Sequence, residues 1–333
     1  MAQLKSKTKA DEDRTILVTG AGGYIGKSLT RALVAQGHDV YAMLWSGCPA
    51  EMAVEGAISF RGDVCNPNDL AQLENTSFDC IYHLAARANV PLSVKDPRGD
   101  FRANVEGTLN MLELACRVKA KRFILPSSVS VLDISNELPF DEDAKVGPSS
   151  PYAAGKLAAE AYCKAYYRAY GLSTGIARLF NVYGPGFTRY SIWDLTNKII
   201  GNPERIEILG DGEQIRDYLH IDDAVTGLQC VAEKGLPGEL YNVATGIPTR
   251  IKELVKLIAK YCGCPDIRVV SAGPSWPGDV PYWYADMNKI HRLGFYPKIS
   301  IEEGIRQTVE WILSERKQIQ LGKSGRLKEQ VNA

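Results

Sequence analysis

The sequence predicts an α/β protein built on a doubly wound parallel sheet, with a smaller mixed lobe toward the carboxyl end. Three observations support this prediction. Short, nearly continuous apolar runs alternate with amphipathic segments over the first half of the chain. The first of these runs leads into a glycine-rich turn and then into a helical pattern. Beyond about Asn181 the alternation gives way to shorter elements and to longer loops rich in Gly and Pro.

The expected elements follow one another in a regular order along the first 180 residues. The β-branched run at 15–19 predicts the first strand, and an amphipathic stretch that includes Leu29 and Leu33 predicts a helix that stops at Gly37. Pro67 suits the first turn of a short helix that ends near Leu73. Six strands are expected, at 15–19, 40–45, 58–60, 80–86, 123–125 and 174–180.

Glycines at 20, 23 and 26 form a G-x-x-G-x-x-G turn between the first strand and the first helix. Gly20 and Gly23 lack side chains where backbone must approach a pyrophosphate, and Gly26 allows the helix to pack closely on the strand. The unpaired N–H groups at the helix start favour the phosphate charge. A glycine triplet alone is weak evidence, but its place between a strand and a helix predicts a dinucleotide-binding turn rather than a plain loop.

Later segments complete the expected organisation. Helical periodicity recurs at 101–116 and 249–261, and Ser300 with Glu303 predicts a capping box before an apolar helix. The following divisions are expected: a disordered lead-in at 1–13, a dinucleotide-binding (Rossmann) domain at 14–180 with contributions from about 215–248, a substrate-binding lobe at 181–214 and 249–315, and a polar tail at 316–333.

The end of the second strand is where folds of this type place an Asp or Glu that holds the ribose hydroxyls. Here Leu44, Trp45 and Ser46 occupy it, and no Arg or Lys follows within several positions to mark a 2′-phosphate site. This stretch therefore leaves the choice between NAD and NADP open. The missing cation favours NAD, because a 2′-phosphate without one forfeits charge-assisted hydrogen bonds.

Composition excludes several classes of partner. The chain has 333 residues with 39 basic and 39 acidic side chains, so no net charge favours nucleic acid or an anionic membrane surface. No apolar run approaches the roughly 20 residues of a membrane span. The eight scattered cysteines, several within apolar patterns, favour reduced thiols and a cytoplasmic location. Cys262-Gly263-Cys264 has no histidine near it in sequence, so no metal is expected.

Tyr152 and Lys156 place a phenol and an ammonium on one helix face. The ammonium stabilises the phenolate and lowers the pKa of the tyrosine from about 10 toward neutrality. The phenolate could then take a proton from a sugar or alcohol hydroxyl while a hydride leaves the same carbon. By itself the Y-x-x-x-K spacing is common by chance, and a surface pair is the plain alternative.

Ser127 and Ser128 follow the fifth strand, at the carboxyl edge of the sheet. A serine there can hydrogen-bond the reacting oxygen and pass its proton. A mere capping role is the better interpretation for Ser127 and the poorer one for Ser128.

With the glycine turn, the serine and the Y-x-x-x-K pair in this order, the chain resembles the extended short-chain dehydrogenase/reductase family, in its nucleotide-sugar epimerase/dehydratase branch. The resemblance runs from about Ile16 to Ile312. Further segments match the family pattern at 63–64, 83–86, 104–108, 178–185, 210–212, 216–218 and 277–280. His83, within one of them, is expected to be a packed strand residue rather than a ligand or base.

The resemblance implies roles for individual residues. Its catalytic set is a Tyr152 base, its partner Lys156 and Ser128. The implied cofactor contacts are Gly20, Gly23, Tyr24, Ile25, Gly26, Asp63, Val64, Leu84, Ala85, Ala86, Asn104 and Lys156. The implied substrate contacts are Ser128, Tyr152, Asn181, Arg216, Asp279 and Trp283. Of these, Asn181 and Arg216 contact the diphosphate, and Trp283 limits bulk near carbon 2 of the sugar.

Departures from the family pattern narrow the function. Dehydratases of this branch carry an Asp-Glu pair directly after the serine or threonine, and here those positions are Val129 and Ser130, which cannot eliminate water. The usual Arg ahead of Pro-Gly-Asp is Trp276, which leaves more of the phosphate contact to Arg216.

The expected function is a nucleotide-sugar 4-epimerase with tightly held NAD, acting on a UDP-hexose or UDP-hexuronic acid. The alternatives are an NAD(P)H-dependent keto-sugar reductase and, more remotely, a non-catalytic nucleotide-binding regulator. A small-residue stripe formed by Ala154, Ala158, Ala161 and Ala165 lies opposite Lys156 on its helix. It predicts a homodimer through the helices at 101–117 and 152–170, unless another helix of the same chain covers it.

Overall fold

The computed structural model describes residues 13–274 and 281–320. Backbone contacts group these residues into two compact units. The first unit contains the chain up to Ser127, with Ser150–Ile176 and Val231–Glu239, and the second contains Ser128–Ser149, Ala177–Cys230 and the chain from Leu240 onward. Each unit is made of three segments, whereas the expected division gave two segments to each part, at 14–180 with 215–248 and at 181–214 with 249–315. The tail beyond residue 320 and the lead-in up to residue 12 lie outside the described residues.

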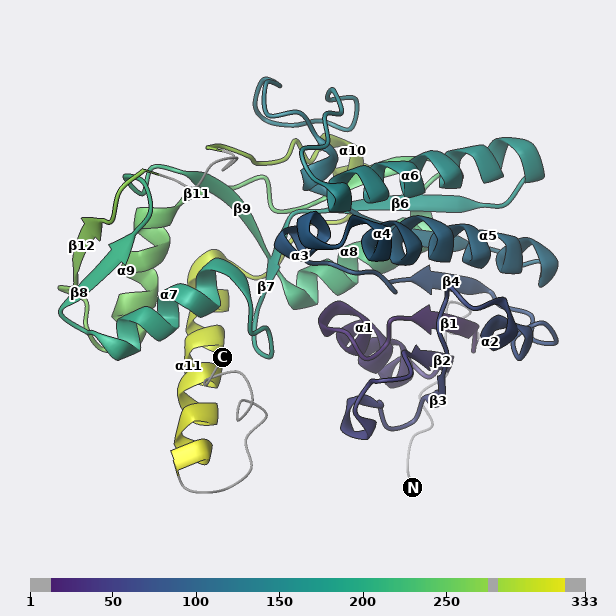
Figure 1. Cartoon of the computed structure of the whole chain (residues 1–333), viewed down its shortest axis with the longest axis horizontal. Coiled ribbons are helices and arrows are strands. Elements are labelled where there is room, and N and C mark those ends of the chain that lie inside the picture. Colours follow the sequence, from purple (N-terminus) through teal and green to yellow (C-terminus); the bar gives the residue numbers. More distant parts are fainter. Residues whose placement is uncertain (1–12, 275–280, 321–333) are drawn as a thin grey trace, which may run out of the picture. The chain divides into compact units, whose positions relative to one another are not determined.

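The largest sheet has seven strands in the order β10-β6-β5-β4-β1-β2-β3 (Figure 1). Its members are β1 (Thr15–Thr19), β2 (Asp39–Leu44), β3 (Ile58–Arg61), β4 (Cys80–His83), β5 (Phe123–Ser128), β6 (Thr174–Leu179) and β10 (Leu240–Val243). The pairs β1–β2, β1–β4, β2–β3 and β4–β5 are parallel. The order runs outward from β1 in both directions, as in a Rossmann sheet. The predicted fold class is confirmed.

The inner strands are apolar along their whole length. All residues of β4 and β6 are buried, as are four of the five in β1. A strand covered on both faces shows no polar alternation, which explains the continuous apolar runs of the sequence. β4 ends at His83 rather than at residue 86 as expected. The chain turns there because the backbone N–H groups of Leu84 and Ala85 donate to the carbonyl and hydroxyl oxygens of Thr19, each at 3.2 Å.

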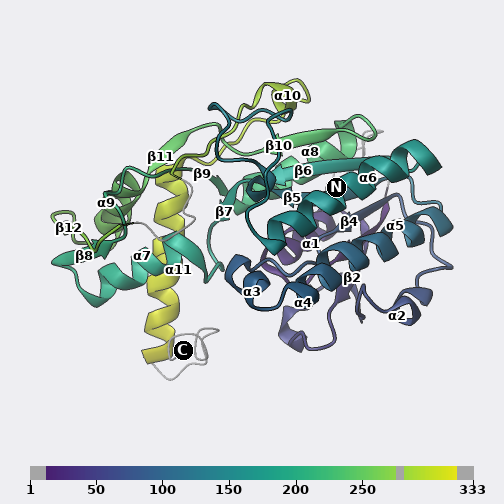
Figure 2. The ribbon, with the colours of Figure 1, turned by 45° about the horizontal axis from the view of Figure 1, so that its top comes forward.

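Helices of the first unit pack beside this sheet. They are α1 (Tyr24–Ala35), η1 (Ala50–Met52), α2 (Pro67–Ala71), α3 (Val90–Lys95), α4 (Pro97–Phe101), η2 (Arg102–Glu106), α5 (Gly107–Arg117) and α6 (Pro151–Tyr170). The helix predicted at 101–116 begins earlier, at Pro97, and its π-helical segment η2 leads into α5. Figures 1 and 2 both show α5 and α6 side by side.

The second unit contains two small sheets and its own helices. Its further strands are β7 (Asn181–Tyr183), β8 (Arg205–Ile208), β9 (Ile215–His220), β11 (Pro248–Arg250) and β12 (Arg268–Ser271). The order β11-β9-β7 forms one sheet, and β8 pairs with β12. Its helices are η3 (Val129–Val131), α7 (Tyr190–Gly201), α8 (Ile221–Lys234, whose last turn belongs to the first unit), α9 (Ile251–Tyr261), α10 (Asn288–His291) and α11 (Ile301–Gln320).

A separate apolar core contains side chains from α7, α9 and α11. Ile199, Ile258 and Val309 are fully buried in it. Half of the predicted capping box forms at α11, since the Ser300 hydroxyl accepts from the Glu303 N–H at 3.2 Å. The Glu303 carboxylate pairs instead with Arg306, at 2.6 Å. Among the residues described, no helix combines the length and apolarity needed to cross a membrane.

Candidate active site

The glycine turn after β1 is packed so tightly that side chains would not fit. Gly20 adopts φ +66°, and a Cβ on it would lie 2.6 Å from the backbone nitrogen of Ala85. A Cβ on Gly26 would lie 2.1 Å from the Gly20 carbonyl oxygen, and one on Gly23 would lie 3.2 Å from the same atom. Gly23 is the N-cap of α1, whose first turn holds Tyr24 and Ile25, and no side chain caps this helix start. The turn therefore fits a dinucleotide, because it presents bare backbone and N–H groups to a pyrophosphate.

Two further predicted cofactor segments lie in the same unit. Asp63 and Val64 follow β3, where the Asp63 N–H donates to the Asp69 carboxylate at 2.8 Å and the Val64 carbonyl accepts from the Asn110 amide at 3.0 Å. Asn104, only 2% exposed, accepts from the Arg87 N–H at 2.9 Å and donates to the Arg87 carbonyl at 3.2 Å. Asn104 thereby fixes the loop that begins with Leu84, Ala85 and Ala86.

His83 is a packed residue of β4, as the sequence predicts. Its ring nitrogens lie 2.9 Å from the Thr19 hydroxyl and 3.1 Å from the Thr108 hydroxyl. Burial lowers the pKa of His83 to about 3, and the charge of Lys156 acts in the same direction. The imidazole is therefore neutral at physiological pH.

The tyrosine–lysine pair lies in the first two turns of α6. Ser150 caps this helix by accepting from the Ala153 N–H at 3.2 Å. Tyr152 is half-buried, and Lys156 is 7% exposed, with its ammonium donating to the Pro126 carbonyl in β5 at 3.0 Å. Burial lowers the pKa of Lys156 to about 8, and the Asp100 charge is the strongest opposing effect. The alternative that Tyr152 and Lys156 are only a surface pair is therefore wrong for Lys156, because this lysine is buried.

Asp100 is a buried acid that the sequence analysis did not single out. Its carboxylate is 1% exposed, and neither oxygen has a hydrogen-bond partner in the described part of the chain. A Cβ on Gly155 of α6 would lie 3.4 Å from one of these oxygens. Burial raises the pKa of Asp100, against the effects of the nearby Asn104 amide and of the Arg87 and Lys156 charges. The sequence feature that could have drawn attention to Asp100 is its place one helical turn before Asn104.

In the second unit, Ser128 ends β5 and begins η3. Its hydroxyl accepts from the Ser130 N–H at 3.3 Å and lies 2.9 Å from the Ser130 hydroxyl. The serine that caps a local turn is thus Ser128, whereas the capping interpretation was assigned to Ser127. Ser127 is 4% exposed, and its hydroxyl has no partner among the described residues.

Two of the predicted substrate residues are brought together in the second unit. The Arg216 guanidinium lies 4.8 Å from the centre of the Trp283 ring. The same guanidinium donates to the Ile215 carbonyl at 2.8 Å and to the Pro281 carbonyl at 3.3 Å. Stacking on an aromatic ring fixes the plane of an arginine without neutralising its charge. Arg216 is therefore fixed in place on its strand, whereas Asp279 and Trp276 lie outside the described residues.

Asp217 organises this part of the second unit, although sequence reasoning assigned it no role. It is fully buried, and its carboxylate accepts from the Thr245 N–H at 2.8 Å, the Thr245 hydroxyl at 2.6 Å, the Gly246 N–H at 2.8 Å and the Ala285 N–H at 3.3 Å. Its carbonyl accepts from the Asn181 amide at 2.8 Å. Asp217 thus joins the strand that carries Arg216 to Asn181 and to the segment of Trp283.

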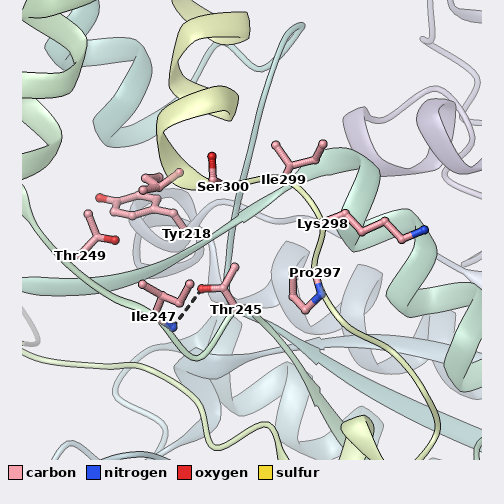
Figure 3. Close-up of a pocket in the computed structure, with 9 residues that line it drawn as sticks. Tyr218, Thr245, Ile247, Thr249, Pro297, Lys298, Ile299 and Ser300 are labelled. Atoms are coloured by element: carbon pink, nitrogen blue, oxygen red, sulfur yellow. Dashed lines mark hydrogen bonds between the residues drawn. The ribbon is translucent and has the colours of Figure 1, made fainter.

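A cavity of about 250 Å³ lies within the second unit (Figure 3). It is lined by Tyr218, Thr245, Ile247, Thr249, Pro297, Lys298, Ile299, Ser300 and Ile301. In Figure 3 the Thr245 hydroxyl accepts from the Ile247 N–H, at 3.1 Å. None of the predicted site residues lines this cavity.

Comparisons with known proteins identify similar sequences. The family model described as the NAD dependent epimerase/dehydratase family matches residues 16–244. A UDP-glucose 4-epimerase of Mycolicibacterium smegmatis is 33% identical over 89% of this chain and 97% of that protein. A dTDP-glucose 4,6-dehydratase of Streptomyces griseus is 30% identical over 89% and 93%. A UDP-glucuronate 4-epimerase of Thermodesulfobacterium geofontis is 34% identical over 89% and 95%.

Solved structures of similar proteins extend the comparison. The UDP-glucose 4-epimerase of Thermotoga maritima with UDP-glucose has a TM-score of 0.83 and 31% identity over 92% of this chain and 99% of that one. A UDP-N-acetylglucosamine 4-epimerase of Methanobrevibacter ruminantium with UDP-N-acetylmuramic acid has a TM-score of 0.82 and 29% identity over 91% and 99%. The UDP-glucose 4-epimerase of Thermus thermophilus with NAD has a TM-score of 0.79 and 29% identity over 90% and 99%.

Proposed function

Because the chain belongs to the NAD-dependent epimerase/dehydratase family, we propose that it is a nucleotide-sugar 4-epimerase that uses bound NAD. The substrate we propose is a UDP-hexose or a UDP-hexuronic acid. One observation supports catalysis most strongly: Lys156 is buried, aimed at β5 and placed one helical turn after Tyr152. A regulator that only bound nucleotides would need neither Tyr152 as a base nor a buried lysine one turn after it.

In the proposed reaction, each residue of the set has a separate task. NAD, when bound, accepts a hydride from carbon 4 of the sugar and returns it. Tyr152 removes the proton of the C4 hydroxyl and later gives it back as general acid. Lys156 stabilises the Tyr152 phenolate through its positive charge and reaches the nicotinamide ribose hydroxyls. Ser128 hydrogen-bonds the reacting oxygen. The 4-keto sugar turns over before hydride returns to its other face.

The residues after Ser128 support an epimerase over a dehydratase. Val129 is 5% exposed and apolar, and Ser130 is hydrogen-bonded to Ser128 itself. Neither side chain can act as an acid or base for removing water. Epimerisation at carbon 4 removes no water and so needs no acid or base at these positions.

The substrate assignment follows from the second unit. Arg216 and Asn181 suit a diphosphate, since one is a fixed cation and the other carries an amide held by the strand next to it. The Trp283 indole would leave little room beside carbon 2 of the sugar. We therefore expect plain hexoses or hexuronic acids to react with higher kcat/KM than N-acetylated sugars. Equal kcat/KM values for UDP-glucose and UDP-N-acetylglucosamine would contradict this.

Assembly and location are further parts of the proposal. Ala154, Ala161 and Ala165 of α6 are exposed in the single chain, and Ala158 is half-buried, so no helix of the described chain covers the stripe fully. Phe101 is 59% exposed and Tyr162 is 38% exposed near the same helices. We propose a homodimer through α5 and α6. We also place the enzyme in the cytoplasm, because all eight cysteines are free thiols.

The main alternative is a reductase of nucleotide keto-sugars that consumes NADPH. The absence of an acid at Leu44, Trp45 and Ser46 favours it, since NAD-specific sites use that acid. One incubation separates the two reactions. The protein is mixed with UDP-glucose or UDP-galactose without reductant, and the C4 epimers are quantified by chromatography. Interconversion without net nicotinamide oxidation supports the epimerase. Turnover only of a keto-sugar with stoichiometric NADPH would identify the reductase.

A further inference from the structure

The end of β2 contacts the glycine turn, where the ribose of a bound dinucleotide lies. The Ala21 N–H donates to the Met43 carbonyl at 3.1 Å. A Cβ on Gly22 would lie 3.3 Å from the Leu44 side chain and 2.4 Å from the Cys48 sulfur. Side chains at residues 44–48 are therefore placed to contact that ribose, although no carboxylate stands among them.

The fold brings a cation to this place from another strand. Leu44 is paired in register with Arg61, the last residue of β3. The Arg61 guanidinium reaches across and donates through Nη1 to the Ser46 carbonyl at 2.8 Å and to the Trp45 carbonyl at 3.3 Å. The sequence predicts no cation here because none follows β2 closely, but Arg61 arrives by strand pairing.

Arg61 is anchored by one nitrogen only. Its Nε and Nη2 atoms make no hydrogen bond within residues 13–274 and 281–320, and its side chain is exposed. A guanidinium fixed at one corner and open at the other two nitrogens presents a fork that matches phosphate geometry. The two carbonyls fix the fork's position in advance, so less rotamer freedom is lost on binding.

The local electrostatics agree with this geometry. Cys48 lies in the loop after β2, and burial raises the pKa of its thiol. Among the charges that act on that thiol, Arg61 has the largest effect and Lys27 the next, both lowering the pKa, while Glu51 raises it. Lys27 is held nearby, donating to the Glu51 carbonyl at 2.9 Å. The Arg61 guanidinium is thus the strongest charge acting on the thiol of this loop.

We propose that Arg61 lets the ribose end of the dinucleotide site accept a 2′-phosphate, so that the protein binds NADP(H) as well as NAD(H). The Arg61 guanidinium replaces the missing acid as the selector at this position. The proposal depends on the dinucleotide site and not on the sugar chemistry, so it and the epimerase reaction can fail independently.

A competition experiment on the purified protein tests the proposal without using activity. The protein is equilibrated with an equimolar excess of NAD⁺ and NADP⁺, separated from unbound nucleotide and denatured, and the released nucleotides are quantified by chromatography. Arg61→Ala removes the fork. Arg31→Ala serves as the matched control, because Arg31 is an exposed arginine in the middle of α1.

For the wild-type protein we expect NADP⁺ among the released nucleotides. In Arg61→Ala the ratio of NADP⁺ to NAD⁺ should fall by about tenfold to a hundredfold, as expected for loss of charge-assisted hydrogen bonds. The control should keep the wild-type ratio. If Arg61→Ala retains NAD⁺, the variant is folded. If it retains none, Arg61→Lys is measured instead and should give an intermediate ratio of NADP⁺ to NAD⁺. A wild-type protein that releases no NADP⁺, or a ratio that falls less than about threefold, would overturn the proposal.

Discussion

The two units hold their predicted functional residues by different means. In the first unit, Gly20, Gly23 and Gly26 lie within seven positions of one another, and the turn they form joins an adjacent strand and helix, with the backbone at Ala85 packed against Gly20. In the second unit, Asp217 accepts hydrogen bonds from residues 28, 29 and 68 positions away. A local turn is recognisable in a sequence, whereas a hub of distant backbone donors is not. The comparison predicts that the two units respond differently to substitution.

The largest effect is expected from Tyr152→Phe in the first unit. Loss of the phenol removes the general base and should lower kcat by about 10²–10⁴-fold, while the fold and NAD binding remain intact. Steady-state kinetics with a thermal unfolding curve measures both quantities. Near-wild-type turnover in this variant would remove Tyr152 from the mechanism.

Asp217→Asn should destabilise the second unit without changing a residue of the proposed catalytic set. The amide loses the buried negative charge that accepts four hydrogen bonds and turns a donor toward those N–H and O–H groups. We expect a loss of about 2–4 kcal/mol in the free energy of unfolding, measured with urea. The glycine turn should still retain NAD.

Asp266→Asn makes the same chemical change at an exposed position of the second unit and serves as its control. It should leave stability within about 0.5 kcal/mol of the wild type. If the two variants were equally stable, Asp217 would not be the hub that the structure indicates.

Asp100→Asn tests whether the Asp100 charge raises the pKa of Lys156. Lys156 is charged below its pKa of about 8, and the Asp100 charge raises that pKa, as do Cys163 and Glu160 more weakly. Removing the Asp100 charge should lower the pKa of Lys156, so the alkaline limb of the kcat profile should move to lower pH. Glu106→Gln changes an exposed acid of η2 and should leave the profile in place. An unmoved alkaline limb in Asp100→Asn would show that Asp100 does not act through Lys156.

Ala158→Arg should have the smallest effect on the fold, because it adds a long charged side chain at a half-buried position of α6. A dimer packed through small residues has no room for it, so the variant should sediment as a monomer. The matched substitution Lys164→Arg at an exposed position of the same helix should leave the assembly unchanged. A dimer that persists in Ala158→Arg would reject this interface.

These contrasts show what the sequence could reveal. The fold class, the glycine turn and the Tyr152–Lys156 spacing were predictable because each depends on neighbouring residues. Asp217 was not, since an isolated acid in a sequence gives no sign of its burial, and Asp100 offered only its place one helical turn before Asn104. The cation beside Ser46 was not predictable for the same reason, because Arg61 reaches Ser46 only through the pairing of β2 with β3.

The most direct test of the central proposal follows one hydrogen atom. UDP-glucose carrying deuterium at carbon 4 is incubated with the protein in ordinary water, and the products are examined by NMR and mass spectrometry. A 4-epimerase returns the hydride to the carbon from which it came, so the UDP-galactose formed should retain deuterium at carbon 4. Deuterium transferred to carbon 6 with loss of water would indicate a dehydratase. Deuterium lost to solvent, or no conversion of either UDP-glucose or UDP-glucuronic acid labelled in this way, would likewise contradict the proposed function.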